Sequence, residues 1–260
     1  KASKSTVNTS LQFLLTDPYY TFDGVAKTIS TTISKTDVSS TSTSSYLSDT
    51  FSAGVSYDMP ISETSTFGLG YDIALTEFTT TIGSPIIVTH HIADHGKTSL
   101  GVTLKSNYVS DTRNRTVFAE IGTRNSLNGS LFLGLDGASH ASLTHRTESN
   151  KGHILKTFGF DWSTVFQLKT IIGIGGGLGS ATSLPFYNKF YAGGNTTVRG
   201  YKGSSLGPLT YNAPRSQNTC AAKAVPGKYI ECDAVGGDFL TVAQFNWIFS
   251  PPPFLGEDTR

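Results

Sequence analysis

Apolar and polar residues alternate along much of this chain, most clearly in residues 49–59 and 66–78. The apolar positions of these segments are Phe51, Ala53, Val55, Tyr57 and Met59, then Phe67, Leu69, Tyr71, Ile73 and Leu75. The residues between them are mostly Gly, Ser and Thr. A period of two is typical of a β-strand with one apolar and one polar face. Both segments are therefore predicted to be strands.

The same alternation, weaker in places, predicts further strands and brings the total to about nine. They are expected at 4–15, 25–37, 98–109, 123–135, 153–164, 167–179 and 237–249. No segment shows convincing helical periodicity, and the spacing suits antiparallel hairpins better than βαβ units. The sequence therefore predicts an all-β, antiparallel protein.

The predicted connections alternate in length along the chain. They fall near 16–24, 38–48, 60–65, 80–97, 110–122, 136–152, 165–166 and 180–236. The odd-numbered connections are mostly short and the even-numbered ones are long, although 110–122 fits this rule poorly. Alternate connections of an up-and-down sheet lie at opposite ends, so one end carries short turns and the other carries long loops. This asymmetry is typical of outer-membrane β-barrels.

Aromatic residues gather toward the short-turn end of the predicted strands. They are Tyr19, Tyr20, Phe22, Tyr57, Phe67, Tyr108, Phe118, Trp162, Phe166, Trp247 and Phe249. Amphipathic rings at one depth are favoured at a membrane interface, and we interpret these residues as an aromatic girdle. The alternative is a set of ordinary strand aromatics that cap the core of a soluble sandwich.

The composition excludes some classes of function. The chain is 37% hydrophobic but only 15% charged, with a net charge of +1 and no run of Lys or Arg. A nucleic-acid surface is therefore not expected. No apolar run approaches the roughly 20 residues of a transmembrane helix. Barrel strands, by contrast, expose only alternate residues to lipid and give a weak hydropathy signal.

The strand count suggests that the barrel is incomplete. Nine is an odd number, whereas even numbers are usual in bacterial barrels. The last predicted strand is followed by three prolines, Phe254 and a polar tail, with no closing strand. Open strand edges do not survive in lipid, because unpaired amides are costly there. We therefore expect residues 1–260 to form one domain that is an incomplete portion of a larger transmembrane β-barrel.

A segment of the longest connection resembles a known family. Residues 190–194 read FYAGG, residues 198–201 read VRGY and residues 206–208 read LGP. This order resembles the sixth extracellular loop of the BamA family of outer-membrane protein insertases. A weaker resemblance extends in the same order over about residues 10–254. It includes the turn near 111–122, where Ala119 replaces the usual Pro.

The resemblance implies that 180–236 is a long extracellular loop that folds back into the barrel lumen. Its motif residues are Gly193, Gly194, Val198, Arg199, Gly200 and Tyr201. The glycines permit tight turns, and Arg199 would anchor the loop to acidic groups on the inner wall. The position where the family commonly has an acidic partner holds Asn246, which makes Asn246 a candidate partner without charge pairing.

The two cysteines of the chain, Cys220 and Cys232, lie in the same connection. Two free thiols remain an alternative, but the close spacing within a loop favours a local disulfide and an oxidising compartment. The family resemblance implies the same pairing, because its members often carry a cystine in this loop.

Three patterns that suggest other chemistry have simpler explanations. Residues 203–207 match the G-x-S-x-G pattern of hydrolases, but no predicted helix follows the serine. His90, His91 and His95 would suit zinc on a helix, yet we expect solvated histidines in a loop. The glycines of 173–179 depart from a phosphate-binding motif and fit the lumen face of a crowded strand. No catalytic residue, metal or cofactor is predicted.

By resemblance, we expect the central barrel of the machinery that folds and inserts β-barrel proteins into the bacterial outer membrane. The implied partners are unfolded outer-membrane protein clients, accessory lipoproteins of the assembly complex and outer-membrane lipid. Residues 1–260 contain neither a POTRA-like βααββ pattern nor the strands of the family's lateral seam. The alternatives are a related translocation-assembly or two-partner-secretion transporter, a passive porin, and a binding module built on a soluble sandwich.

Overall fold

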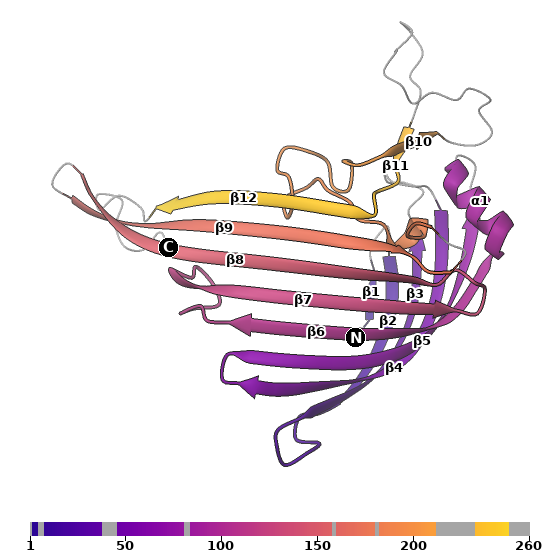
Figure 1. Ribbon diagram of the computed structural model, residues 1–260, viewed down its shortest axis with the longest axis horizontal. Helices are drawn as coiled ribbons and strands as arrows, with labels where there is room; N and C mark the ends of the chain where they lie inside the picture. Colours follow the sequence, from indigo (N-terminus) through magenta and orange to yellow (C-terminus); the bar gives the residue numbers. More distant parts are fainter. Residues whose placement is uncertain are drawn as a thin grey trace, which may run out of the picture.

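The strands pair into one long, curved antiparallel sheet in the computed structural model, which describes residues 2–4, 8–37, 46–80, 84–157, 160–179, 182–211 and 232–249 (Figure 1). Within these residues the sheet has ten strands, and only the pair β9–β12 joins strands that are not consecutive. The elements are β1 (Ala2–Lys4), β2 (Asn8–Asp17), β3 (Ala26–Asp37), β4 (Tyr46–Ser62), β5 (Ser65–Thr80), α1 (Ile86–His95), β6 (Thr98–Asp111), β7 (Ile121–Gly134), β8 (His140–Thr157), β9 (Phe160–Gly177), η1 (Phe186–Asn188), β10 (Leu209–Tyr211), β11 (Cys232–Ala234) and β12 (Phe239–Phe249).

The sheet is open. It curls so that β1 to β3 lie behind β6 to β9 in Figure 1, and in the described part of the chain its edge strands β1 and β12 do not pair with each other. The small pair β10–β11 belongs to the connection between β9 and β12. This architecture confirms the predicted antiparallel, incomplete barrel.

The two faces of the sheet have the polarity of a membrane barrel. On β5 the outward side chains of Leu69, Tyr71, Ile73 and Leu75 are each between 42% and 53% exposed. The residues between them are small or polar and face the inside of the curve. An apolar exterior around a polar interior is what lipid requires. It is the reverse of a soluble sandwich, whose strands turn their apolar face inward.

Seven of the nine predicted strands are confirmed with small shifts of their bounds, and an eighth, 167–179, covers the second part of β9, but the region around β8 was predicted wrongly. The predicted loop 136–152 is mostly strand, and the predicted strand 153–164 crosses the turn between β8 and β9. The first twelve residues of β8 are polar on both faces, with only Ala141 and Leu143 as apolar members. Backbone pairing with β7 and β9 forms this strand, so alternation did not reveal it.

The helix α1 is the second departure, because 80–97 was predicted to contain no helix. Val88 of α1 is completely buried and packs with Phe78 and Phe186, which come from β5 and from the long loop. The helix is thus stabilised by tertiary contacts rather than by a periodic apolar face of its own. In the described part of the chain, neither helix is long and apolar enough to span a membrane.

The predicted aromatic girdle appears as clusters of rings at the short-turn end. The ring of Tyr20 lies 5.9 Å from that of Tyr57, and Lys27 places its ammonium 4.7 Å from the centre of the Tyr20 ring. Trp247 stacks with Phe166 at 5.6 Å and contacts Phe249 at 4.6 Å. The side chain of Trp162 lies outside the described part of the structure. Rings gathered at this end fit a membrane interface.

Candidate functional site

The long connection between β9 and β12 lies against the inner face of β9, where that strand has glycines instead of side chains. A Cβ atom on Gly173 would lie 2.8 Å from the ring of Phe190, and one on Gly175 would lie 2.7 Å from Leu184. Gly176, which points outward, has nothing within 4 Å. Gly173 and Gly175 therefore make room for the loop, which confirms for these two the interpretation that glycines line a crowded inner face.

Asp238 ties the start of this loop to its end. Its Oδ1 atom accepts hydrogen bonds from the Leu184 N–H and from the Lys189 ammonium, both at 3.1 Å. Its carbonyl oxygen accepts the N–H of Gly175 at 2.8 Å. Sequence reasoning did not single out Asp238, because one acidic residue before a strand carries no distinctive signal.

Aromatic side chains from three parts of the chain close the long-loop end of the inner space. Phe186 is buried against Tyr46 at 4.9 Å and Phe78 at 5.2 Å, and Tyr187 stacks on Phe78 at 4.9 Å. Burial raises the pKa of Tyr187 to about 12. His91 of α1 packs 5.2 Å from Phe186, and burial lowers the pKa of this imidazole. Loop, strand and helix thus share one apolar cluster.

The glycine-rich signature forms a compact turn. Thr197 accepts the Gly193 N–H at 2.8 Å and donates its hydroxyl to the Gly193 carbonyl at 2.9 Å. Gly194 donates its N–H to the carbonyl of Tyr201 at 3.1 Å. Gly193, Gly194 and Gly200 all have φ between +87° and +109°, a conformation that other residues resist. The turn therefore requires the glycines that define the motif.

The tip of this turn contacts the wall through Thr197, whose carbonyl accepts a hydrogen bond from the side chain of Gln244 on β12. Val198 is half-buried, whereas Arg199 is exposed and forms no ion pair or hydrogen bond with another described residue. Asn246 instead donates to Gln167, its direct neighbour across the β9–β12 pair, at 3.1 Å. The structure therefore does not bring Arg199 and Asn246 together.

A charged network lies on the inner wall below the loop. The guanidinium of Arg113, whose side chain is only 6% exposed, binds Asp111 at 2.8 Å and Glu148 at 3.2 Å. Glu148 also approaches Lys169 at 3.6 Å. Between wall and loop tip is a cavity of about 300 Å³. Its polar and charged lining residues include Arg124, Arg146, Glu148, Lys169, Thr196 and Gln244.

The remaining predicted residues have separate outcomes. Cys220 lies outside the described residues, so its pairing with Cys232 of β11 remains a prediction. His90, His91 and His95 lie on helix α1, so the expected loop is wrong for all three. His90 is exposed as expected, whereas His91 packs against aromatic rings. Within the described ranges, no group of three or more His, Cys, Asp or Glu residues is placed to hold a metal ion.

The G-x-S-x-G pattern at 203–207 belongs to a turn. No helix is found in the described residues that follow it, and the Ser205 hydroxyl donates to the Lys202 carbonyl at 2.7 Å. This is not the strand–turn–helix context that a hydrolase serine needs.

An antiparallel sheet with an apolar exterior, a polar interior and an infolded loop defines a portion of an outer-membrane β-barrel. Comparison with known families agrees, because the profile of the Omp85 superfamily domain matches residues 1–259. The chain belongs to the Omp85 superfamily. Its location is accordingly the outer membrane.

Two relatives show how far the similarity extends. The chain is 32% identical over 222 residues to the outer membrane protein assembly factor BamA of Neisseria meningitidis serogroup B, covering 81% of this chain and 26% of that protein. The crystal structure of BamA from Haemophilus ducreyi lacking POTRA domains 1–3 has the same fold, with a TM-score of 0.79 and 19% identity. That match covers 99% of this chain and 48% of the other. The chain thus spans between a quarter and a half of these relatives.

Proposed function

We propose that this chain provides the middle wall and the infolded loop of an insertase that folds β-barrel proteins into the outer membrane. The observation that carries the proposal is the signature loop packed on the glycines of β9. The identity to the Neisseria assembly factor supports it. Such an insertase needs no covalent step, because strand edges supply backbone hydrogen bonds to a client before it enters lipid.

The proposed role of the loop is to hold the wall in one shape. Asp238 and the aromatic cluster fasten its base to β9, β5 and α1, and Gln244 contacts its tip. Arg199 then extends from the motif turn without a partner in the described part of the chain. We propose that it pairs with acidic groups contributed by other strands of the complete barrel, as its guanidinium fork suits carboxylates. Val198, Gly200 and Tyr201 complete that anchor motif.

The proposed partners are unfolded outer-membrane proteins, accessory lipoproteins and the surrounding lipid. A transporter of the same superfamily remains the second candidate, because family membership alone does not distinguish insertion from translocation. The loop that packs on the inner face of β9 argues against an open, passive porin.

The test uses the full-length parent protein in liposomes and measures the folding rate of an unfolded β-barrel client. We expect faster folding than in empty liposomes. Asp238→Ala should slow folding about fivefold, equivalent to about 1 kcal/mol, because it releases the loop base. Asp94→Ala, at an exposed acidic residue of α1, should behave like the unmodified protein.

Three results would count against the insertase. Client folding no faster than in empty liposomes would contradict the proposal directly. Movement of an unfolded passenger across the membrane without insertion would favour the transporter. Free flux of small solutes would favour the porin.

A further inference from the structure

The outward side chains of β2 to β6 form transverse rows, because these strands pair in regular register toward the long-loop end. Among the rows that run through all five strands, the one nearest the long-loop end consists of Thr9, Lys35, Asp49, Glu77 and Thr98. The next outward row consists of Leu11, Ile33, Phe51, Leu75 and Leu100. The exterior therefore changes from polar to apolar over two residues, or roughly 7 Å along a strand. A boundary this sharp marks the level at which lipid head groups meet acyl chains.

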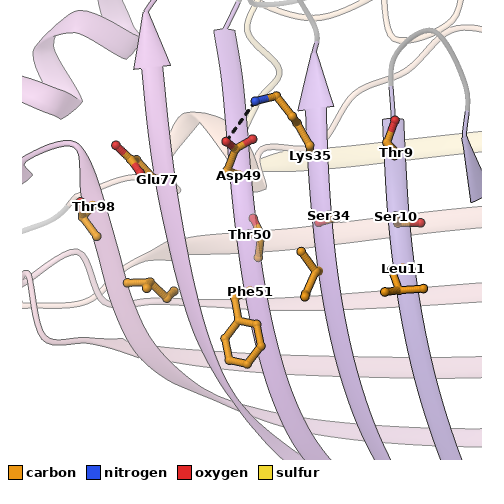
Figure 2. Close-up of a pocket in the computed structure, with 12 residues that line it drawn as sticks. Thr9, Ser10, Leu11, Ser34, Lys35, Asp49, Thr50, Phe51, Glu77 and Thr98 are labelled. Atoms are coloured by element: carbon orange, nitrogen blue, oxygen red, sulfur yellow. Dashed lines mark hydrogen bonds and ion pairs between the residues drawn. The ribbon is translucent and has the colours of Figure 1, made fainter. Parts of the chain in front are cut away.

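A groove of about 730 Å³ crosses this boundary and draws its lining from both rows. Figure 2 shows Lys35, Asp49 and Glu77 at one end of the groove and Leu11 and Phe51 at the other. The apolar end is accessible, since the side chains of Leu11, Ile33 and Phe51 are all exposed. A single amphiphile with its head at the polar row and its chain on the apolar row matches this arrangement.

The polar end of the groove offers one cation and two anions. Lys35 and Asp49 form an exposed ion pair at 3.2 Å, drawn as a dashed line in Figure 2. Glu77 lies directly opposite Asp49 in the β4–β5 register, and like charges at such positions repel. Glu77 has no ion-pair partner among the described residues. An added donor group between the two carboxylates would relieve this repulsion.

We propose that this groove binds a phosphorylated glycolipid of the outer leaflet. Its acyl chain would cover Leu11, Ile33 and Phe51, and its phosphate would approach Lys35. Sugar hydroxyl and amide groups would donate to Asp49 and Glu77. A phosphate alone would meet two carboxylates without a donor for either of them, whereas a phosphorylated sugar supplies several donors beside its phosphate. This site lies on the exterior and is independent of the proposed insertase function.

The experiment uses the full-length protein in nanodiscs of phosphatidylcholine with a minor fraction of monophosphoryl lipid A. Native mass spectrometry after release from the nanodiscs measures the retained lipid A. Lys35→Gln removes the phosphate contact, and Ile33→Trp fills the apolar end with a side chain that membrane interfaces tolerate. Each should lower retention about fivefold. The control variant Lys151→Gln replaces an exposed lysine of β8 that lies toward the short-turn end of the sheet. It should leave the retention of lipid A unchanged.

Equal retention of lipid A by the two groove variants and the Lys151→Gln control would overturn the proposal. If phosphatidylethanolamine or phosphatidylglycerol, used in place of lipid A, is retained equally well, the glycolipid assignment is overturned. Folding of each variant is checked by comparing its migration in gel electrophoresis before and after heating. The client-folding assay should be unaffected by Lys35→Gln, so a failure of this site and a failure of the insertase function are separable.

Discussion

Gly173 and Gly175 show how single residues decide where the long loop lies. Without side chains they leave the inner face of β9 open, and Phe190 and Leu184 occupy that space. The neighbouring Gly176 points to the other face and contacts nothing there. Three nearby glycines in one run thus have different roles, which alternate with the two faces of the strand.

Replacing Gly175 with valine should displace the loop base. The new Cβ atom would lie 2.7 Å from a Leu184 methyl group and 3.0 Å from the Ala141 carbonyl, so something must shift. We expect a loss of about 1–3 kcal/mol in the free energy of unfolding. Urea denaturation of the full-length protein measures it, with Gly176→Val as the matched control. Equal stability of the two variants would contradict the packing described here.

A similar comparison is available between two arginines of the turn after β6. Arg113→Ala should cost about 2 kcal/mol, because it removes the nearest cation of Asp111 and Glu148 and leaves them only the more distant Arg124 at 3.9 Å and Lys169 at 3.6 Å. Arg115→Ala breaks an exposed pair with Glu120 and should cost less than about 1 kcal/mol. The same denaturation experiment ranks the two variants. A cost at Arg113 no larger than at Arg115 would show that the buried network is unimportant.

At the scale of elements, α1 and β8 form for reasons that lie outside their own sequences. The helix becomes stable when Val88 is buried by Phe78 and Phe186, which are distant along the chain. The strand β8 carries polar residues on both faces and is held by pairing with two neighbours. The pattern of apolar and polar residues predicts an element only where one of its faces is apolar, so it predicted neither α1 nor β8.

Docking of α1 should weaken in mild acid. Burial is the main cause that lowers the pKa of His91, helped by His95 and His140 and opposed by Asp136 and Asp94. Well above the ordinary histidine pKa of about 6.5, His91 is neutral whether α1 is docked or not, and pH has no effect. Below it, the undocked helix takes up the proton more readily, so docking is lost progressively as the pH falls.

Hydrogen exchange of the α1 amides, expressed as protection factors at about pH 7.5 and about pH 5.5, measures this dependence. We expect lower protection in acid and a smaller change in His91→Phe, which keeps the aromatic contacts without the titration. His90→Gln, at an exposed position, serves as the control. An unchanged pH dependence in His91→Phe would exclude His91 as its origin.

For the whole molecule, the distribution of polarity over the exterior determines where the sheet can reside. Outward residues of β5 from Phe67 to Leu75 are apolar, a span of nine residues that agrees with the roughly 9–11 residues of a transmembrane strand. Polar groups appear at the next outward position, Glu77.

The free-energy cost of introducing an outward charged residue should therefore depend on its depth in the membrane. Ile73→Arg, in the middle of the apolar span, should cost about 2–4 kcal/mol, whereas Thr98→Arg in the polar row should cost roughly 0–1 kcal/mol. Reversible folding of the full-length protein into lipid vesicles provides both values. Equal costs at the two depths would mean that this face does not contact lipid.

The sequence by itself determined the class of fold, the polarity of the two faces and the loop that carries the family signature. These features depend on alternation and on glycines whose backbone conformation is local, so neighbouring residues along the chain suffice to reveal them. Only the tertiary structure decided that α1 and β8 form, that Asp238 and Gln244 hold the loop, and that Asn246 pairs with Gln167 rather than with Arg199. Those outcomes depend on which residues meet across the sheet, and that is set by strand register and curvature rather than by any single segment.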